Sequence, residues 1–118
     1  MPILNIYEQE KTAVHNARGG DGTIYGMTAW TEEDLNTPTV GIGLTIMPPG
    51  TSVGLHEHEG EEELYFIIKG EGLATVDGEE KTVGPGDMVL CPVGGSHAMR
   101  NTGDSDLEFF GMVVRQVE

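Results

Sequence analysis

Glycine residues divide this chain into short apolar runs, and this division limits the folds that it can adopt. The 118 residues include 18 glycines, roughly twice the usual share. The apolar runs between them recur at intervals of roughly ten residues, which is the spacing of strands in a sandwich or a barrel. A chain of this length can bury a core without disulfides, so we expect one domain over residues 1–118.

Strand signals occur along most of the chain. Residues 40–46 alternate apolar side chains with glycine or threonine, and Asp77-Gly78 lies between two short runs, which predicts a hairpin. Residues 31–35 favour a helical turn, because Thr31 suits an N-cap and acidic residues follow it. The strands that we expect cover residues 24–30, 40–46, 64–68, 73–76, 80–83, 88–91, 99–102 and 107–114. The sequence therefore predicts an all-β protein, a closed or nearly closed barrel with at most one short helical turn.

The charge of the chain argues against several functions. Twenty acidic residues against six basic ones give a net charge of −14. The basic residues are scattered singly, so we expect no nucleic-acid binding and no attraction to an anionic membrane. No apolar run approaches the ~18 residues of a membrane span. The single cysteine, Cys91, excludes internal disulfides, and the absence of a signal peptide predicts a cytoplasmic location.

Three of the four histidines belong to one pattern. His56 and His58 are two residues apart on an expected strand, so their side chains project from the same face. Glu63 begins the next apolar run, and His97 follows the turn-forming residues 92–95. Three imidazoles and one carboxylate suit a divalent transition metal ion. The alternative is a metal-free barrel with buried, hydrogen-bonded histidines, which is costly because each buried polar group needs a partner.

The glycine framework around these residues resembles the two sequence motifs of the cupin family. The first motif corresponds to Gly50-x5-His56-x-His58-x4-Glu63-x6-Gly70. The second motif corresponds to Gly86-x5-Pro92-x-Gly94-x2-His97-x3-Asn101. Residues 71–85 separate them, a spacing that is similar to that of short, single-domain bacterial cupins.

This resemblance implies a jelly-roll β-barrel, also called a double-stranded β-helix. Motif 1 would occupy residues 50–70, motif 2 residues 86–101, and an N-terminal arm and loop residues 1–22. The resemblance implies one divalent transition metal ion, with manganese or iron favoured and nickel, cobalt, zinc or copper also acceptable. The motif glycines and proline would form turns, and Asn101 would have a structural role. The implied metal ligands are His56, His58, Glu63 and His97.

For such a cupin we expect a mononuclear metal enzyme that acts on a small organic molecule. Oxygenase, decarboxylase and isomerase chemistry all remain open, because the fold hosts many unrelated reactions. The alternative function is a non-catalytic module that binds a small ligand or a metal. Tyr65, in register with Glu63 on one strand face, is the candidate catalytic proton donor. Arg18 is one of three arginines that could hold a substrate carboxylate.

Two further expectations concern the surface. We expect a homodimer, in which the apolar N-terminal arm adds to a strand edge of the neighbouring copy, because this arm has no evident partner within the chain. The glutamates that flank the histidines are expected to form a solvated loop and to raise the histidine pKa in the metal-free protein. The arm residues are Ile3, Leu4, Ile6 and Tyr7, and the glutamates are Glu57, Glu59, Glu61 and Glu62.

Overall fold

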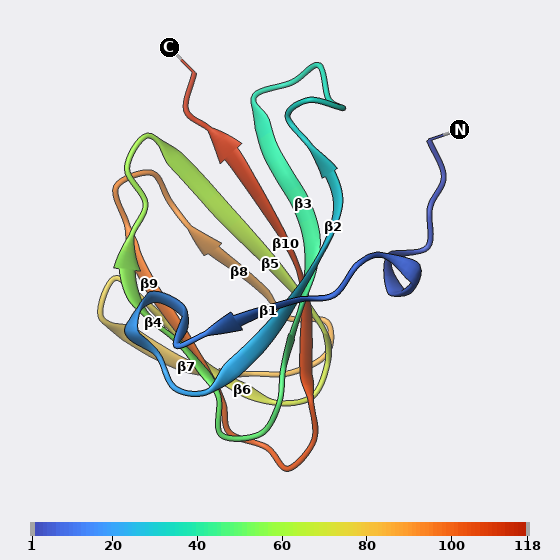
Figure 1. Ribbon diagram of the computed structural model, residues 1–118. Helices are drawn as coiled ribbons and strands as arrows, with labels where there is room; N and C mark the ends of the chain where they lie inside the picture. Colours follow the sequence, from blue (N-terminus) through green and yellow to red (C-terminus); the bar gives the residue numbers. More distant parts are fainter. Residues whose placement is uncertain (1, 118) are drawn as a thin grey trace.

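Two antiparallel sheets that face each other form the protein (Figure 1). The structure is a computed structural model that describes residues 2–117. One sheet has six strands in the order β1-β2-β3-β10-β5-β8, and the other has four in the order β4-β9-β6-β7. The strands are β1 (Thr12–His15), β2 (Thr23–Thr31), β3 (Thr39–Met47), β4 (Ser52–Glu57), β5 (Glu61–Lys69), β6 (Gly72–Val76), β7 (Glu79–Val83), β8 (Met88–Cys91), β9 (Ser96–Asn101) and β10 (Leu107–Arg115). The predicted all-β, jelly-roll architecture is confirmed, although within residues 2–117 no strand of one sheet pairs with a strand of the other.

The predicted strands are present, but the predicted helical turn is not. Residues 32–34 form a hydrogen-bonded turn, in which the Asp34 amide donates to the Thr31 carbonyl at 2.9 Å. The Glu32 amide donates to the Val40 carbonyl, so the β2–β3 pairing continues past Thr31 into the residues that were expected to begin a helical turn. Two single 3₁₀ turns occur elsewhere, η1 (Ile6–Glu8) and η2 (Ala17–Gly19). Within the described residues, no helix is long and apolar enough to cross a membrane.

The Asp77-Gly78 hairpin is confirmed, whereas β1 was not predicted. Asp77 and Gly78 both have positive φ, of 48° and 83°, as the tight turn between β6 and β7 requires. All four residues of β1 are exposed, so this strand has no apolar alternation that a sequence could reveal.

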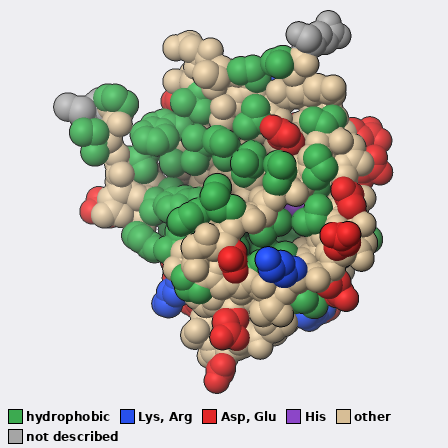
Figure 2. Space-filling view, turned by 180° about the vertical axis from the view of Figure 1, so that it is seen from behind, with side chains coloured by type: hydrophobic (Ala, Val, Ile, Leu, Met, Phe, Trp, Pro, Cys, Tyr) green, Lys and Arg blue, Asp and Glu red, His purple; other side chains and the backbone are tan. Residues whose placement is uncertain are grey.

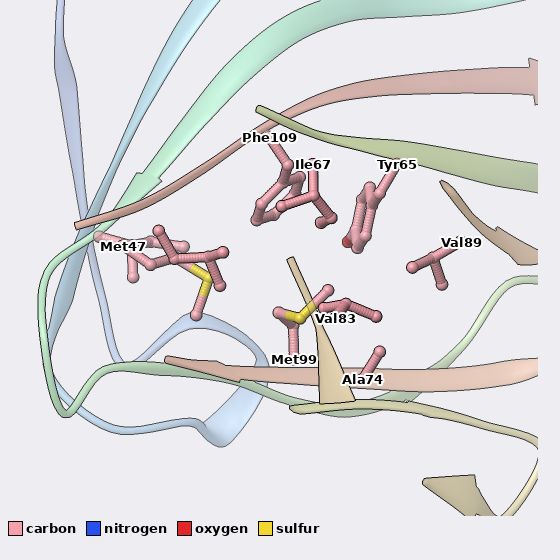
Figure 3. Close-up of a cluster of buried hydrophobic side chains, with 10 residues drawn as sticks. Met47, Tyr65, Ile67, Ala74, Val83, Val89, Met99 and Phe109 are labelled. Carbon is pink, nitrogen blue, oxygen red and sulfur yellow. The ribbon is translucent and has the colours of Figure 1, made fainter. Parts of the chain in front are cut away.

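The main core fills the space between the two sheets. Figure 3 shows side chains of the six-stranded sheet pointing toward those of the four-stranded sheet. Phe109 and Ile67 are at most 1% exposed, as is Met99 on the opposite side. The labelled members of the cluster are Met47, Tyr65, Ile67, Ala74, Val83, Val89, Met99 and Phe109.

The outer face of the six-stranded sheet is apolar as well. Leu44 and Ile46 lie on the face opposite to Met47, because successive side chains of a strand alternate. They pack with Met27 and with Ile6 of η1 in a second cluster. Leu44 and Ile46 of β3 therefore face away from the main core, whereas Met47 at the end of the strand faces into it.

The N-terminal arm folds back over this outer face. The expectation that the arm has no partner within the chain is wrong for Ile6, which is buried, and for Tyr7, whose hydroxyl donates to Glu108 Oε1 at 2.9 Å. Ile3 remains 78% exposed. The arm therefore closes one part of its own sheet.

Asn101 joins the end of β9 to two neighbouring segments. Its Nδ2 donates to the Met47 carbonyl at 2.7 Å and to the Ser105 carbonyl at 2.9 Å. Its Oδ1 accepts the Gly103 amide at 2.9 Å, and the residue is 3% exposed. This side chain therefore holds β3, β9 and the loop before β10 together.

We predict that Asn101→Ala lowers the free energy of unfolding by about 2–3 kcal/mol, because the substitution leaves a buried carbonyl without its donor. Urea denaturation of the variant and the wild type measures this difference. Asn5→Ala is the matched control, since Asn5 caps only the exposed turn η1. An Asn101→Ala protein as stable as the control would contradict this role.

Candidate metal centre

Four potential metal-binding side chains come together between the two sheets. His56 on β4 and His97 on β9 are direct partners in the β4–β9 register. His58 follows β4, and Glu63 lies on β5 of the opposite sheet. The structure thus brings together all four residues that the sequence singled out, with one ligand atom from each within 4.8 Å of the others.

The turn before β9 fixes the position of His58. The His58 amide donates to the Gly95 carbonyl at 3.0 Å, and the Gly94 amide donates to the His58 carbonyl at 2.8 Å. Gly94 has a φ of 78°, which favours glycine. The second motif therefore supplies His97 and also the backbone that holds His58 beside it.

The side-chain nitrogens and one carboxylate oxygen converge closely. His97 Nε2 lies 3.0 Å from His58 Nε2 and 3.0 Å from His56 Nε2. Glu63 Oε1 lies 3.1 Å from both His58 Nε2 and His97 Nε2. His97 Nε2 thus has three polar neighbours, and one N–H could donate to only one of them.

The hydrogen bonds on the far side of two rings decide which nitrogen carries the proton. His56 Nδ1 lies 2.7 Å from the Gly54 carbonyl oxygen, which can only accept, so Nδ1 carries the hydrogen. His58 Nδ1 lies 3.4 Å from Glu61 Oε1. This contact is longer, but the carboxylate is also an acceptor, so it too favours a hydrogen on Nδ1. In the neutral rings, both Nε2 atoms are then bare acceptors directed at the centre.

This donor set fits a divalent cation. Bare imidazole nitrogens and a carboxylate oxygen repel one another unless positive charge lies between them. Separations of about 3 Å suit atoms that share one ion at about 2.1 Å each. His56, His58, Glu63 and His97 could therefore hold a metal ion between the two sheets.

The surroundings favour the protonation states that a metal ion needs. Burial lowers the pKa of His56, and the positive charges of His97, Arg18 and His58 lower it further. The hydrogen bond to the Gly54 carbonyl raises this pKa but does not outweigh them. The expectation that neighbouring glutamates raise the histidine pKa is therefore wrong for His56, because burial and nearby cations dominate there.

The Glu63 carboxyl remains ionised in this setting. Burial alone raises its pKa, but the hydrogen bond and charge of His97, the charge of His58 and the Tyr65 hydroxyl together hold the pKa below its usual value. A neutral His56 and an ionised Glu63 are the metal-binding forms of both groups.

Tyr65 contacts two members of the cluster. Its hydroxyl donates to Glu63 Oε1 at 3.1 Å, and its ring stacks on His97 with centroids 5.3 Å apart. Burial and the Glu63 carboxylate raise the pKa of Tyr65 well above its usual value. The phenol therefore stays protonated and orients the carboxylate oxygen.

A cavity of about 340 Å³ adjoins Glu63 and Tyr65. Its walls come from the inner faces of β2, β3, β5 and β10, where small side chains leave room. A side-chain carbon at Gly26 would meet nothing within 4 Å. The volume lies within the usual range of small-molecule sites, roughly 300–1,000 Å³. The small and polar wall residues include Gly26, Thr28, Thr31, Gly41, Gly43, Thr45 and Gly111.

Other residues considered from the sequence lie outside the cluster. His15 is exposed on β1, and Cys91 is buried. Glu59 is exposed between β4 and β5, as expected for a solvated loop, but the loop expectation is wrong for Glu57, which ends β4, and for Glu61 and Glu62, which begin β5 and are partly buried. Sequence reasoning missed the contact of Glu61 with His58 and the contact of the Gly54 carbonyl with His56, because spacing alone does not reveal which atom orients a ring.

The chain also matches known proteins. A family model described as "Cupin domain" matches residues 43–114. A Thermotoga maritima protein named "Oxalate-binding protein" is 37% identical over 112 residues, which cover 95% of this chain and 93% of that protein. A Bradyrhizobium 5-nitrosalicylic acid 1,2-dioxygenase is 40% identical over 70 residues, which cover 59% of this chain and 33% of that enzyme.

A solved structure has nearly the same backbone. It is a Thermotoga maritima protein described as a predicted oxalate decarboxylase, with a TM-score of 0.94 and 33% sequence identity. The match covers 97% of this chain and 99% of that chain.

We predict that His56→Ala, His58→Ala and His97→Ala each remove most of the bound metal and leave a folded β-protein, because the main core is built from other residues. Glu63→Gln is expected to be milder, since an amide oxygen is a weaker donor than a carboxylate. Elemental analysis together with far-UV circular dichroism measures both effects. His15→Ala is the control, and full metal occupancy in any of the three histidine variants would reject that residue as a ligand.

Acidification should destabilise the metal-free protein through His56. Since the folded-state pKa of His56 is below its usual 6.5, the unfolded chain binds more protons as the pH falls through that value, and stability is lost. Glu63, whose pKa is also lowered, adds a further loss as the pH falls below 4.5. The thermal midpoint, measured in chelator at about pH 7.5 and 5.5, should therefore decrease less between these two pH values for His56→Gln than for wild type. Equal decreases in the thermal midpoint would contradict the lowered pKa of His56. Protonation of the acidic residues relieves charge repulsion in both proteins alike, so this effect cancels in the comparison.

Proposed function

The chain belongs to the cupin family, and from this membership we propose that it binds one divalent transition metal ion and holds a small carboxylate ligand beside it. The ion would be held by His56, His58, Glu63 and His97. The observation that supports this most is the convergence of Nε2 atoms and one carboxylate oxygen at 3.0–3.1 Å beside a cavity of about 340 Å³. When bound, the ion supplies Lewis acidity to the oxygen atoms of a ligand.

We propose manganese or iron as the ion. Three imidazoles and one carboxylate form a mixed nitrogen and oxygen donor set, which suits these ions and also nickel or cobalt. Zinc and copper bind such sets with higher intrinsic affinity, so they could enter in their place. The hydrogen bonds of His56 to Gly54 and of His58 to Glu61 fix the rings for whichever ion is bound.

We propose a small carboxylic acid as the ligand, with oxalate as the compound to test first. The relative named an oxalate-binding protein spans nearly the whole chain. Three threonines line the cavity and offer hydroxyl groups to ligand oxygen atoms, namely Thr28, Thr31 and Thr45. Residues 1–118 would act as one cupin domain, with the arm covering the outside of the sheet.

Turnover of the ligand is the second candidate function. A raised pKa keeps the Tyr65 proton in place, and its hydroxyl donates to Glu63. The proton-donor role of Tyr65 stays a prediction, as do oxygenase, decarboxylase and isomerase chemistry. The alternative is binding without reaction, in which case Tyr65 only positions Glu63.

Calorimetric titration of oxalate into metal-loaded and chelator-treated protein tests the proposal. We expect binding only with metal, and no binding to metal-treated His97→Ala. The same samples, assayed for carbon dioxide and formate, distinguish an enzyme from a binding module. Oxalate binding that is unchanged by chelation would contradict the proposed site.

We further propose that two copies pair through the outer face of the six-stranded sheet. Figure 2 shows hydrophobic side chains gathered into a broad patch on the back of the molecule. Phe66 is 44% exposed, Met88 68% and Phe110 36%. Together with Ile42, Leu64 and Met112 they line a shallow hollow of about 150 Å³.

A second copy suits this patch better than a charged partner. The chain carries a charge of −14, but the side chains that line this hollow are apolar, so two copies can meet there without placing like charges together. The patch also adjoins the region that Ile6 covers from within the chain, because Leu44 on β3 pairs with Phe110 on β10. The proposed interface differs from the dimer predicted from the sequence, in which the N-terminal arm adds to a strand edge of the neighbouring copy.

Sedimentation velocity tests the interface. We expect a dimer for wild type and a monomer for Phe66→Asp combined with Met88→Asp, because desolvating two carboxylates in the patch is costly. Leu55→Asp is the control, since Leu55 is 65% exposed on β4 of the other sheet. A dimeric double variant would overturn this interface.

A further inference from the structure

The two sheets leave a groove on the side where β7 and β8 run. In the part of the chain that the structure describes, β7 pairs only with β6 and β8 only with β5, so each is the last strand of its sheet. A groove of about 680 Å³ lies between these two edges. Its inner wall includes Ala74, Val83 and Val89, which belong to the main core (Figure 3). The groove therefore reaches apolar side chains at the margin of the core.

The register of β8 shows which of its backbone groups face the groove. The Ile67 amide of β5 donates to the Asp87 carbonyl at 2.9 Å. Bonded and non-bonded positions alternate along an antiparallel pair, so Val89, two residues further on, also bonds to β5. The amide and carbonyl groups of Met88 and Leu90 then point away from β5. These groups face the groove and are available to a further strand.

Apolar side chains line both faces of this free edge. Val89 is buried and points inward, whereas Met88 and Leu90 alternate with it and are exposed. The edge strands of soluble proteins usually carry charged side chains or proline, which discourage pairing with another chain. Residues 88–91 include neither. The edge of β8 therefore lacks the usual protection against the addition of a strand.

The rim of the groove is acidic. Asp77, Glu79 and Glu80 line it, together with one basic residue, Lys81. Glu79 and Glu80 are exposed, and the whole chain has a net charge of −14. A segment with basic residues at its ends is therefore attracted to this rim, whereas an acidic segment, such as one from a second copy of this chain, is repelled.

We propose that this groove is a docking site for an extended segment of another protein, which adds to β8 as a further strand of the six-stranded sheet. Main-chain hydrogen bonds to Met88 and Leu90 hold the segment, as in other cases of strand addition. Because successive side chains of a strand point to opposite faces, its apolar residues contact Val89 on the inside and Leu90 on the outside. Basic residues at its ends lie beside the acidic rim. This docking site is independent of the metal centre and of its ligand.

Fluorescence anisotropy with a labelled, capped peptide of alternating valine and tyrosine between two lysines tests the proposal. Leu90→Pro should weaken binding of this peptide by about fivefold or more, because a main-chain donor is lost. Proline is tolerated at an edge position whose amide makes no bond within the sheet, so the variant should keep the far-UV circular dichroism of wild type. Leu90→Val is the matched control, because it keeps the amide and an apolar side chain.

Two altered peptides test the mode of binding on the wild-type protein, so this test does not depend on the folding of a variant. The same peptide with N-methylated backbone amides should bind about fivefold more weakly or less. A peptide with glutamates in place of the lysines should also bind more weakly, and this difference should shrink as the ionic strength rises. Equal binding of the N-methylated peptide would overturn strand addition and indicate a groove for apolar small molecules. No binding of the original peptide would overturn the docking site altogether.

Sedimentation velocity of Leu90→Pro tests whether a second copy occupies the edge instead. Leu90 does not line the hollow that Phe66 and Phe110 form on the outer face of the sheet. The variant should therefore have the same oligomeric state as wild type. A dimeric wild type and a monomeric Leu90→Pro would show that a second copy pairs with β8, and would overturn the proposed partner.

Discussion

Four polar groups that meet between two sheets impose the constraint on which the rest of this structure depends. His56 and His97 lie on strands of the four-stranded sheet, and His58 directly follows one of these strands. Glu63 lies on β5 of the six-stranded sheet. Because the Gly54 carbonyl and the Glu61 carboxylate direct two ring hydrogens outward, the Nε2 atoms of His56 and His58 are acceptors that face the centre beside the Glu63 carboxylate, an arrangement that suits a cation. The glycine turns, the close β4–β9 pairing and the buried Tyr65 all serve to hold these atoms together.

The inner and outer faces of the six-stranded sheet have different roles. Small residues of β3 face inward and leave a cavity beside Glu63, whereas Leu44 and Ile46 face outward and pack under Ile6. An ordinary sheet would direct its larger apolar side chains to the core. On β3 the reversed pattern leaves a cavity beside Glu63 and an apolar outer surface, which the proposed second copy would cover, although Met47 of the same strand still packs in the main core.

The sequence predicted the parts of the fold that depend on local pattern. Alternation at residues 40–46 identified β3, the Asp77-Gly78 pair identified a hairpin, and motif spacing identified the four clustered side chains. It did not indicate which face of β3 is inside, because alternation has the same period on both faces. Nor did it predict the partner of Ile6, the turn in place of a helix after Thr31, or the approach of the Arg18 carbonyl to Gly54. Each of these depends on contacts between segments that are distant in the chain.

The most direct test of the central claim is an anomalous diffraction measurement on crystals grown with manganese. We expect one strong anomalous peak within bonding distance of the Nε2 atoms of His56, His58 and His97 and of one Glu63 oxygen. A manganese peak elsewhere on the protein, with none at this cluster, would contradict it.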